Sequence, residues 1–109
     1  MNGLLIDYKW CSGCHSCEVA CKNEHDIPLG RWGIKLTETG PWQIGEDVWH
    51  HDFIPTPTSL CDLCAERVSQ GRQPSCVQHC QAKVMEYGPL EELAKKAEAK
   101  GEKVVIYLP

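Results

Sequence analysis

Cysteine is the residue type of this sequence best suited to metal chemistry, and its eight copies fall into two groups of four. The first group has the spacing C-x2-C-x2-C-x3-C and the second has C-x2-C-x11-C-x3-C. The first consists of Cys11, Cys14, Cys17 and Cys21, and the second of Cys61, Cys64, Cys76 and Cys80. No cysteine lies outside these groups, so one explanation must account for all eight thiols.

The compact spacing of the first group is typical of bacterial iron–sulfur motifs. Its x2 steps form a tight loop that wraps three thiolates around one cubane, and Gly13 lies where the backbone must pass close to inorganic sulfide. The x3 step begins a helix, so Cys17 and Cys21 lie one turn apart. In two-cluster ferredoxins the fourth cysteine of such a run binds the other cluster. The sequence therefore predicts two 4Fe–4S clusters.

Other uses of clustered cysteines explain the pattern less well. A zinc ribbon has two C-x2-C pairs separated by about 15 to 20 residues, whereas the first group places four cysteines within positions 11–21. A disulfide framework requires an oxidising compartment, and a C-x2-C redox pair uses only two thiols. Iron–sulfur ligation uses all eight, so we expect the five histidines to lie on the surface or beside the ligands.

Composition and charge limit the kinds of partner and the compartment that the sequence predicts. The formal net charge of −4 disfavours nucleic acid as a partner. No apolar run approaches the roughly 20 residues that span a bilayer. The N-terminus, MNGLLIDYKW, has no basic segment followed by an apolar one, which predicts a cytoplasmic chain. In the alternative, the chain folds together with a partner that carries an export signal, and the folded complex is exported to the periplasm.

The elements that position the cysteines follow from apolar periodicity and from Gly and Pro. We expect strands over Gly3–Tyr8, Lys83–Tyr87 and Lys103–Leu108, helices over Ser16–Glu24 and Pro89–Lys100, and a helical turn over Ala65–Ser69. The last strand is expected to pair with the first. An irregular insertion at about 28–58 holds two candidate hairpin strands, Trp32–Thr37 and Val48–Ile54.

These elements predict a single α+β domain over residues 1–109. Its expected architecture is a ferredoxin-like dicluster domain with a small β-hairpin insertion and a C-terminal helix and strand. Within the insertion, Trp42 and Trp49 are candidate anchors for a partner, because aromatic side chains are enriched in buried interface cores.

Two stretches of the chain resemble a known family. LLIDYKWCSGCHSCEVACKNEHDIP and CDLCAERVSQGRQPSCVQHCQAKVMEYGPLEEL are similar to cysteine motifs of iron–sulfur electron-transfer (beta) subunits of molybdenum- or tungsten-pterin oxidoreductases. The resemblance is to the dimethyl sulfoxide reductase and polysulfide reductase group. Full-length members carry four such motifs and this chain has two, which implies a short two-cluster form. Lys22 and Gln81 stand where the motif usually has proline.

The resemblance implies a function in electron transfer. The chain is expected to relay electrons, in anaerobic respiration, to or from a large catalytic subunit that holds a molybdopterin or tungstopterin cofactor. A membrane anchor or a soluble carrier is the expected second partner. No nucleotide-binding or catalytic constellation stands out in the sequence, so no catalytic residue is predicted. A free-standing dicluster ferredoxin is the alternative function, and a redox-sensing or structural iron–sulfur module is a third.

The crossing rule of two-cluster ferredoxins assigns the ligands. Cluster 1 is expected to take Cys11, Cys14, Cys17 and Cys80, and cluster 2 to take Cys61, Cys64, Cys76 and Cys21. In the alternative arrangement, each group of four holds its own cluster.

Overall fold

A three-stranded antiparallel sheet organises the chain, in a computed structural model that describes residues 1–109. The strand order is β4-β1-β5, with β1 in the centre. The strands are β1 (Asn2–Asp7), β4 (Met85–Pro89) and β5 (Val104–Tyr107). Strand β1, at the start of the chain, thus lies between two strands from the C-terminal part of the chain. This pairing brings the first cysteine group, which follows β1, close to the second, which precedes β4.

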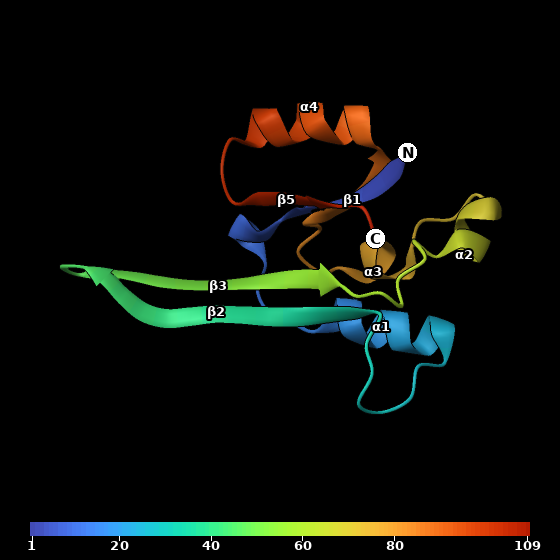
Figure 1. Ribbon diagram of the computed structural model, residues 1–109, viewed down its shortest axis with the longest axis horizontal. Coiled ribbons are helices and arrows are strands. Elements are labelled where there is room, and N and C mark those ends of the chain that lie inside the picture. Colours follow the sequence, from blue (N-terminus) through green and yellow to red (C-terminus); the bar gives the residue numbers. More distant parts are fainter.

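The central strand divides its side chains between two layers. Leu4 and Ile6 are fully buried in a core cluster that also contains four of the cysteines. Leu5, equally buried, points to the opposite face because side chains alternate along a strand. Helix α4 (Leu90–Lys100) packs on that face, where its Leu93 is 1% exposed (Figure 1). One face of the sheet is therefore covered by a helix and the other by the cysteine region.

The remaining helices are short and carry cysteines or precede them. They are the 3-10 helix η1 (Tyr8–Trp10), and the α-helices α1 (Ser16–His25), α2 (Ala65–Ser69) and α3 (Ser75–His79). Asp26 ends α1 by adopting a left-handed conformation, and its N–H donates to the carbonyl oxygen of Lys22. Helices α1 and α3 pack together, and the hydroxyl of Ser75 donates to the carbonyl oxygen of Ala20 over 3.1 Å. None of the helices has both the length and the hydropathy that a bilayer span requires.

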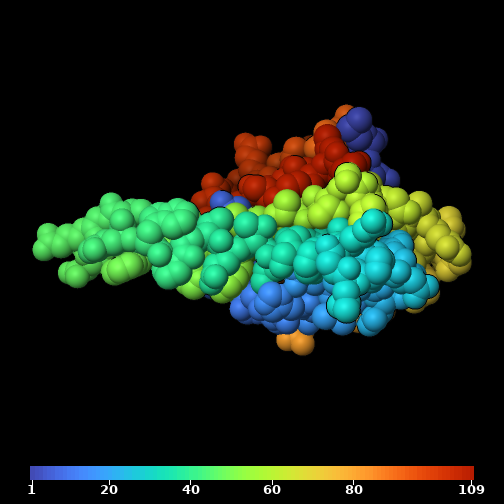
Figure 2. Space-filling view, turned by 60° about the horizontal axis from the view of Figure 1, so that its bottom comes forward, coloured from blue at the N-terminus to red at the C-terminus, as the bar shows by residue number.

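A long two-stranded hairpin forms the middle of the chain. Strands β2 (Ile34–Gly45) and β3 (Val48–Pro57) pair antiparallel, and their far end projects away from the body of the molecule (Figures 1 and 2). At the base, Ile34 and Leu36 are buried. Further along the hairpin, Asp52 is also buried and pairs with Lys103 Nζ over 3.1 Å, which ties the hairpin to the residue before β5. The hairpin is thus anchored at one end and exposed at the other.

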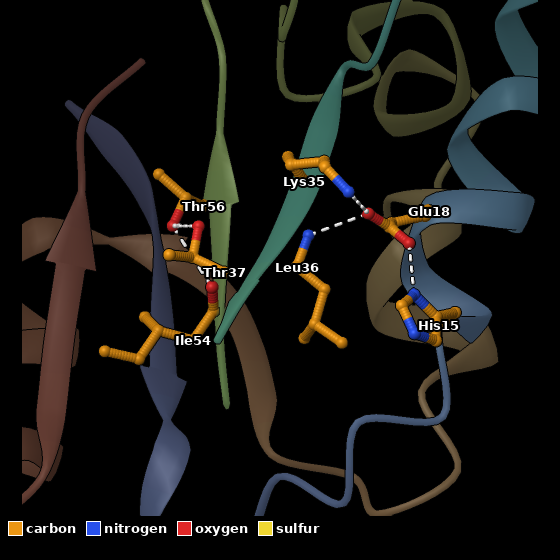
Figure 3. Close-up of polar contacts among 7 residues, drawn as sticks. All are labelled: His15, Glu18, Lys35, Leu36, Thr37, Ile54 and Thr56. Atoms are coloured by element: carbon orange, nitrogen blue, oxygen red, sulfur yellow. Dashed lines mark hydrogen bonds and ion pairs between the residues drawn. The ribbon is translucent and has the colours of Figure 1, made fainter. Parts of the chain in front are cut away.

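Glu18 fastens the hairpin to α1. Its buried carboxylate accepts hydrogen bonds from the Leu36 N–H over 2.8 Å and from His15 Nδ1 over 2.5 Å, and it lies 3.4 Å from Lys35 Nζ (Figure 3). Burial by itself raises the pKa of this carboxyl, but these donors and the lysine charge outweigh burial and lower the pKa. The stabilisation is therefore present above the ordinary pKa range of glutamate and is lost as the pH falls through the lowered pKa.

The expected architecture is confirmed. The strands at both ends of the chain, the helix after the first cysteine loop, the turn over Ala65–Ser69 and the C-terminal helix and strand are all present. Two features differ from expectation. The hairpin strands continue further than expected, β2 to Gly45 and β3 to Pro57, although β2 begins only at Ile34, and α3 is a helix that was not expected.

Replacing Glu18 with alanine is expected to lower the free energy of unfolding by about 1–3 kcal/mol, because the buried Leu36 N–H loses its acceptor. Urea denaturation of the cluster-loaded protein, followed anaerobically by circular dichroism, measures the change. Glu98→Ala on the exposed face of α4 is the matched control and is expected to change stability little. Equal denaturation midpoints for the two variants would contradict the role assigned to Glu18.

Candidate iron–sulfur cluster sites

The eight thiols line two separate cavities, four to each. The thiols that line the first cavity are Cys11, Cys14, Cys17 and Cys80. Those that line the second are Cys21, Cys61, Cys64 and Cys76. Each cavity thus combines three cysteines of one sequence group with a single cysteine of the other. That each lining set is also a ligand set remains a prediction.

The two cysteines that line a cavity together with the other sequence group, Cys21 and Cys80, lie in helix α1 and at the end of helix α3. In α1, Cys17 lines the first cavity and Cys21, one turn later, lines the second. In the other helical segment, Cys76 of α3 lines the second cavity, and Cys80, which caps the C-terminus of α3, lines the first. Helices α1 and α3, which pack together, therefore each contribute one cysteine to each cavity.

Loops supply the other four thiols. Cys11 follows η1 directly, and Cys14 lies in the loop before α1. Cys61 follows the hairpin, and Cys64 caps the N-terminus of α2. Leu63 and Cys64 both have positive φ, at 60° and 52°, a conformation that non-glycine residues seldom adopt. The tight curl that results brings Cys61 and Cys64 to the same cavity.

Gly33, just before β2, makes room for the sulfur of Cys21. A Cβ atom built on this glycine would lie 2.5 Å from Cys21 Sγ, far inside van der Waals contact. The backbone of Gly33 therefore passes closer to the second cavity than any other residue type allows. The sequence predicts such a close approach at Gly13 and gives no indication of Gly33, because nothing in the local sequence places residue 33 beside residue 21.

Burial dominates the electrostatics of the thiols. It raises the pKa of Cys17 to about 12 and of Cys21 to about 11, and it raises the pKa of Cys76 as well. Cys14 is the exposed member, and hydrogen bonds from Ser16 lower the pKa of its thiol. A buried thiolate is unfavourable without a compensating positive charge. Iron supplies that charge, so the donor set and its surroundings fit thiolate-ligated clusters.

Backbone N–H groups complete the surroundings of the sulfur atoms. The Leu63 N–H donates to Cys61 Sγ over 3.5 Å. Backbone groups of Gly13, Glu18, Ile34 and Ser75 act in the same direction, each lowering the pKa of the thiol beside it and so partly offsetting burial. Such donors stabilise negative charge on sulfur and are one of the means by which proteins set cluster potentials. Both cavities therefore offer four thiols, apolar walls and donors aimed at sulfur.

The histidines divide by position. His25 Nε2 lies 3.1 Å from Cys64 Sγ, which places one imidazole directly against a cavity thiol. His15 bonds to Glu18, and His79 Nδ1 lies 2.9 Å from the carbonyl oxygen of Ser75. His50 and His51 belong to the hairpin, with His51 hydrogen-bonded to Glu38. The expectation that histidines lie on the surface or beside the ligands therefore holds, but the sequence did not distinguish His25.

Comparison with known proteins agrees with this geometry. A family model described as 4Fe–4S dicluster domain matches residues 30–90, a segment with the hairpin and the second cysteine group. The chain belongs to this 4Fe–4S dicluster family, and it is an electron-transfer protein with two 4Fe–4S clusters.

Relatives of the chain are named as subunits of oxidoreductases. The chain is 42% identical to formate dehydrogenase 2 subunit beta (cytochrome c-553) of Nitratidesulfovibrio vulgaris, covering 89% of this chain and 80% of that protein. It is 25% identical to the probable anaerobic dimethyl sulfoxide reductase chain YnfG of Escherichia coli, over 86% and 76% of the two chains. It is 32% identical to the thiosulfate reductase electron transfer subunit PhsB of Salmonella typhi, over 54% and 31%.

The first two alignments also report a difference in length. They run over 176 and 156 positions, more than the 109 residues of this chain. Both relatives therefore contain internal segments that face gaps in this sequence. The expected membership of the beta-subunit family is confirmed, and the chain is a shortened form relative to these two proteins.

Gly33→Ala is expected to displace Cys21 from the second cavity and to lower the iron content from about eight to about four atoms per chain, since one of two four-iron clusters is lost. Iron and acid-labile sulfide quantification of the anaerobically purified protein measures this. Gly45→Ala, at the end of the hairpin where a Cβ meets Val48 at an ordinary 3.7 Å, is the control and is expected to retain full iron. Full iron in Gly33→Ala would contradict the close approach described here.

Proposed function

We propose that this chain is the electron-relay subunit of an oxidoreductase whose catalytic subunit holds a molybdenum- or tungsten-pterin cofactor. The observation that carries the proposal is the pair of four-thiol cavities joined by α1 and α3. The names of the relatives support it, because each is a subunit or chain of an oxidoreductase. Substrate chemistry belongs, in this proposal, to the partner.

The spacing of cysteines on α1 suits an electron relay. Cys17 and Cys21 are four residues apart, which is about 6 Å along a helix axis. Thiols so close, facing different cavities, keep the two clusters within short range of each other. When bound, each cluster supplies one-electron chemistry. The protein's own contribution is to hold the eight thiols, to exclude water through residues such as Leu4 and Ile34, and to direct N–H groups at sulfur.

The lining of the cavities supports one division of the cysteines into two ligand sets. We propose that cluster 1 is bound by Cys11, Cys14, Cys17 and Cys80, and cluster 2 by Cys21, Cys61, Cys64 and Cys76. This crossed arrangement is supported by Cys80 lying with the first three cysteines and Cys21 lying with the later three. In the uncrossed alternative, these two residues would have to change cavities.

The exposed end of the hairpin is proposed as a contact for the catalytic subunit. It carries four large apolar side chains that are at least half exposed: Trp42, Ile44, Val48 and Trp49. Glu46 and Asp47 lie between them at the turn, and no Lys or Arg occurs between positions 36 and 66. An apolar patch with an acidic rim suits a partner surface that is apolar with a basic rim.

The second redox partner is proposed to be either a membrane anchor or a soluble electron carrier. We propose a cytoplasmic complex, with export of the folded complex to the periplasm as the alternative. A free-standing ferredoxin would need no exposed aromatic hairpin.

Pairs of cysteine variants test the ligand sets. Cys80→Ser and Cys11→Ser are expected to alter the same component of the electron paramagnetic resonance spectrum of the reduced protein, because they serve one cluster. Cys21→Ser and Cys61→Ser are expected to alter the other component together. If Cys80→Ser instead altered the component that Cys61→Ser affects, each group of four would hold its own cluster.

Affinity purification of the tagged chain from its native host, under anaerobic conditions, tests the proposed function. We expect about eight irons per chain and a large subunit in equal amount that carries molybdenum or tungsten. A variant with both Trp42→Ser and Trp49→Ser is expected to keep its iron but to lose the large subunit, because the apolar contact is removed.

The other outcomes separate the alternatives. Full iron without a stable partner would support a free-standing ferredoxin, and zinc in place of iron would contradict both functions. A large subunit that stays bound to the double variant would show that the hairpin is not the contact.

A further inference from the structure

His25 is the only histidine of the chain with a ring nitrogen hydrogen-bonded to a cysteine sulfur. Its Nε2 lies 3.1 Å from Cys64 Sγ, although the two residues are 39 positions apart. Both residues line the second cavity. His15, which lines the first cavity, bonds to Glu18 instead, and His79 bonds to the backbone at Ser75. The two cavities are therefore unequal: one has an imidazole at a thiol and the other does not.

The position of His25 is set by the helix. Residues four apart lie on one face of an α-helix, so Cys17, Cys21 and His25 form a single row along α1. The first faces one cavity, the second faces the other, and His25 reaches Cys64 one turn further on. Asp26 ends the helix at the next residue, which fixes His25 in the last helical turn.

Cys64 is held independently of His25. Its backbone N–H donates to Asp62 Oδ1 over 2.9 Å, and its positive φ of 52° fixes the direction of the chain at the start of α2. Cys64 is 7% exposed whereas His25 is an exposed residue, so the contact lies at the rim of the cavity, between a buried cysteine and a solvent-facing imidazole. A hydrogen bond to a charged acceptor is stronger than one between neutral groups.

We propose that the Nε2–H of His25 donates a hydrogen bond to the Cys64 thiolate and raises the reduction potential of cluster 2 relative to cluster 1. This inference rests on the proposed ligand sets. An electron delivered to a bound cluster 2 by the proposed redox partner would increase the negative charge on Cys64 Sγ, and the hydrogen bond from His25 would become stronger. The reduced state is therefore stabilised more than the oxidised state. No bond breaks, and the proton remains on Nε2. His25 is a positioning residue that acts through Cys64.

Anaerobic redox titrations of the cluster-loaded protein, monitored by electron paramagnetic resonance, test this inference. In His25→Phe the ratio of reduced to oxidised cluster 2 at a given potential is expected to fall by on the order of tenfold, a downward shift of about 59 mV for a one-electron couple. The component altered by Cys61→Ser identifies cluster 2, and the potential of cluster 1 is expected to stay unchanged. His25→Gln, whose amide N–H can replace the imidazole donor, is expected to recover part of the shift.

His51→Phe is the matched control. This imidazole lies on the hairpin and bonds to Glu38, away from both cavities, so neither potential is expected to move. Unchanged potentials in His25→Phe with full iron would overturn the inference and leave the proposed function standing. A shift confined to the component that Cys11→Ser alters would overturn it as well.

Iron content separates this inference from the proposal on which it rests. A wild-type chain that binds no iron would overturn the proposed function itself. Should His25→Phe lose one cluster, His25→Leu is titrated in its place, with the same expected fall in potential. Loss of that cluster in both apolar variants but not in His25→Gln would assign His25 to cluster assembly, and would overturn its role in setting the potential.

Discussion

The gathering of eight thiols, most of them buried, around two cavities is the constraint on which the rest of this structure depends. In a small domain the hydrophobic core is modest, and here four of the nine residues in the core cluster are cysteines. Leu4 and Ile6 of the central strand pack against them. Burial raises the pKa values of most of these thiols, so the same surroundings that form the core also require a positive charge on iron. Cluster binding and folding are therefore coupled in this chain.

Helix α1 acts as the spacer between the two sites. Three residues form a row along this helix. Cys17 faces the first cavity, Cys21 faces the second, and His25 contacts a thiol of the second cavity. The spacing of Cys17 and Cys21 along the helix sets the distance between the two sites. The position of His25 makes the sites unequal, because only the second site has an imidazole at a thiol. Glu18, on another face of the same helix, holds the hairpin at its base. Electron relay and partner contact thus depend on one ten-residue helix.

Much of this arrangement is visible in the sequence, and the reason is local. The x2 and x3 spacings fix loop and helix geometry over a few residues, and the apolar periodicity of α4 and the β-branched residues of β5 identify those elements. The predicted hairpin is too short because the outer ends of its two strands are exposed on both faces and have no sustained alternation of apolar and polar residues. Gly33, Glu18 and His25 were missed for a different reason. Each of these residues acts on a residue that is distant in the sequence, and a single sequence does not show which distant residues lie close together in the fold.

In the crossed arrangement, each cluster is bound by three cysteines of one group and one of the other. A crystal structure of the cluster-loaded chain, with the iron atoms located by anomalous scattering at the iron edge, distinguishes this arrangement from the uncrossed one. We expect Cys80 Sγ to be bonded to the cluster that also binds Cys17, and Cys21 Sγ to be bonded to the cluster that binds Cys76. Cys17 and Cys21 bonded to the same cluster would contradict the crossed arrangement.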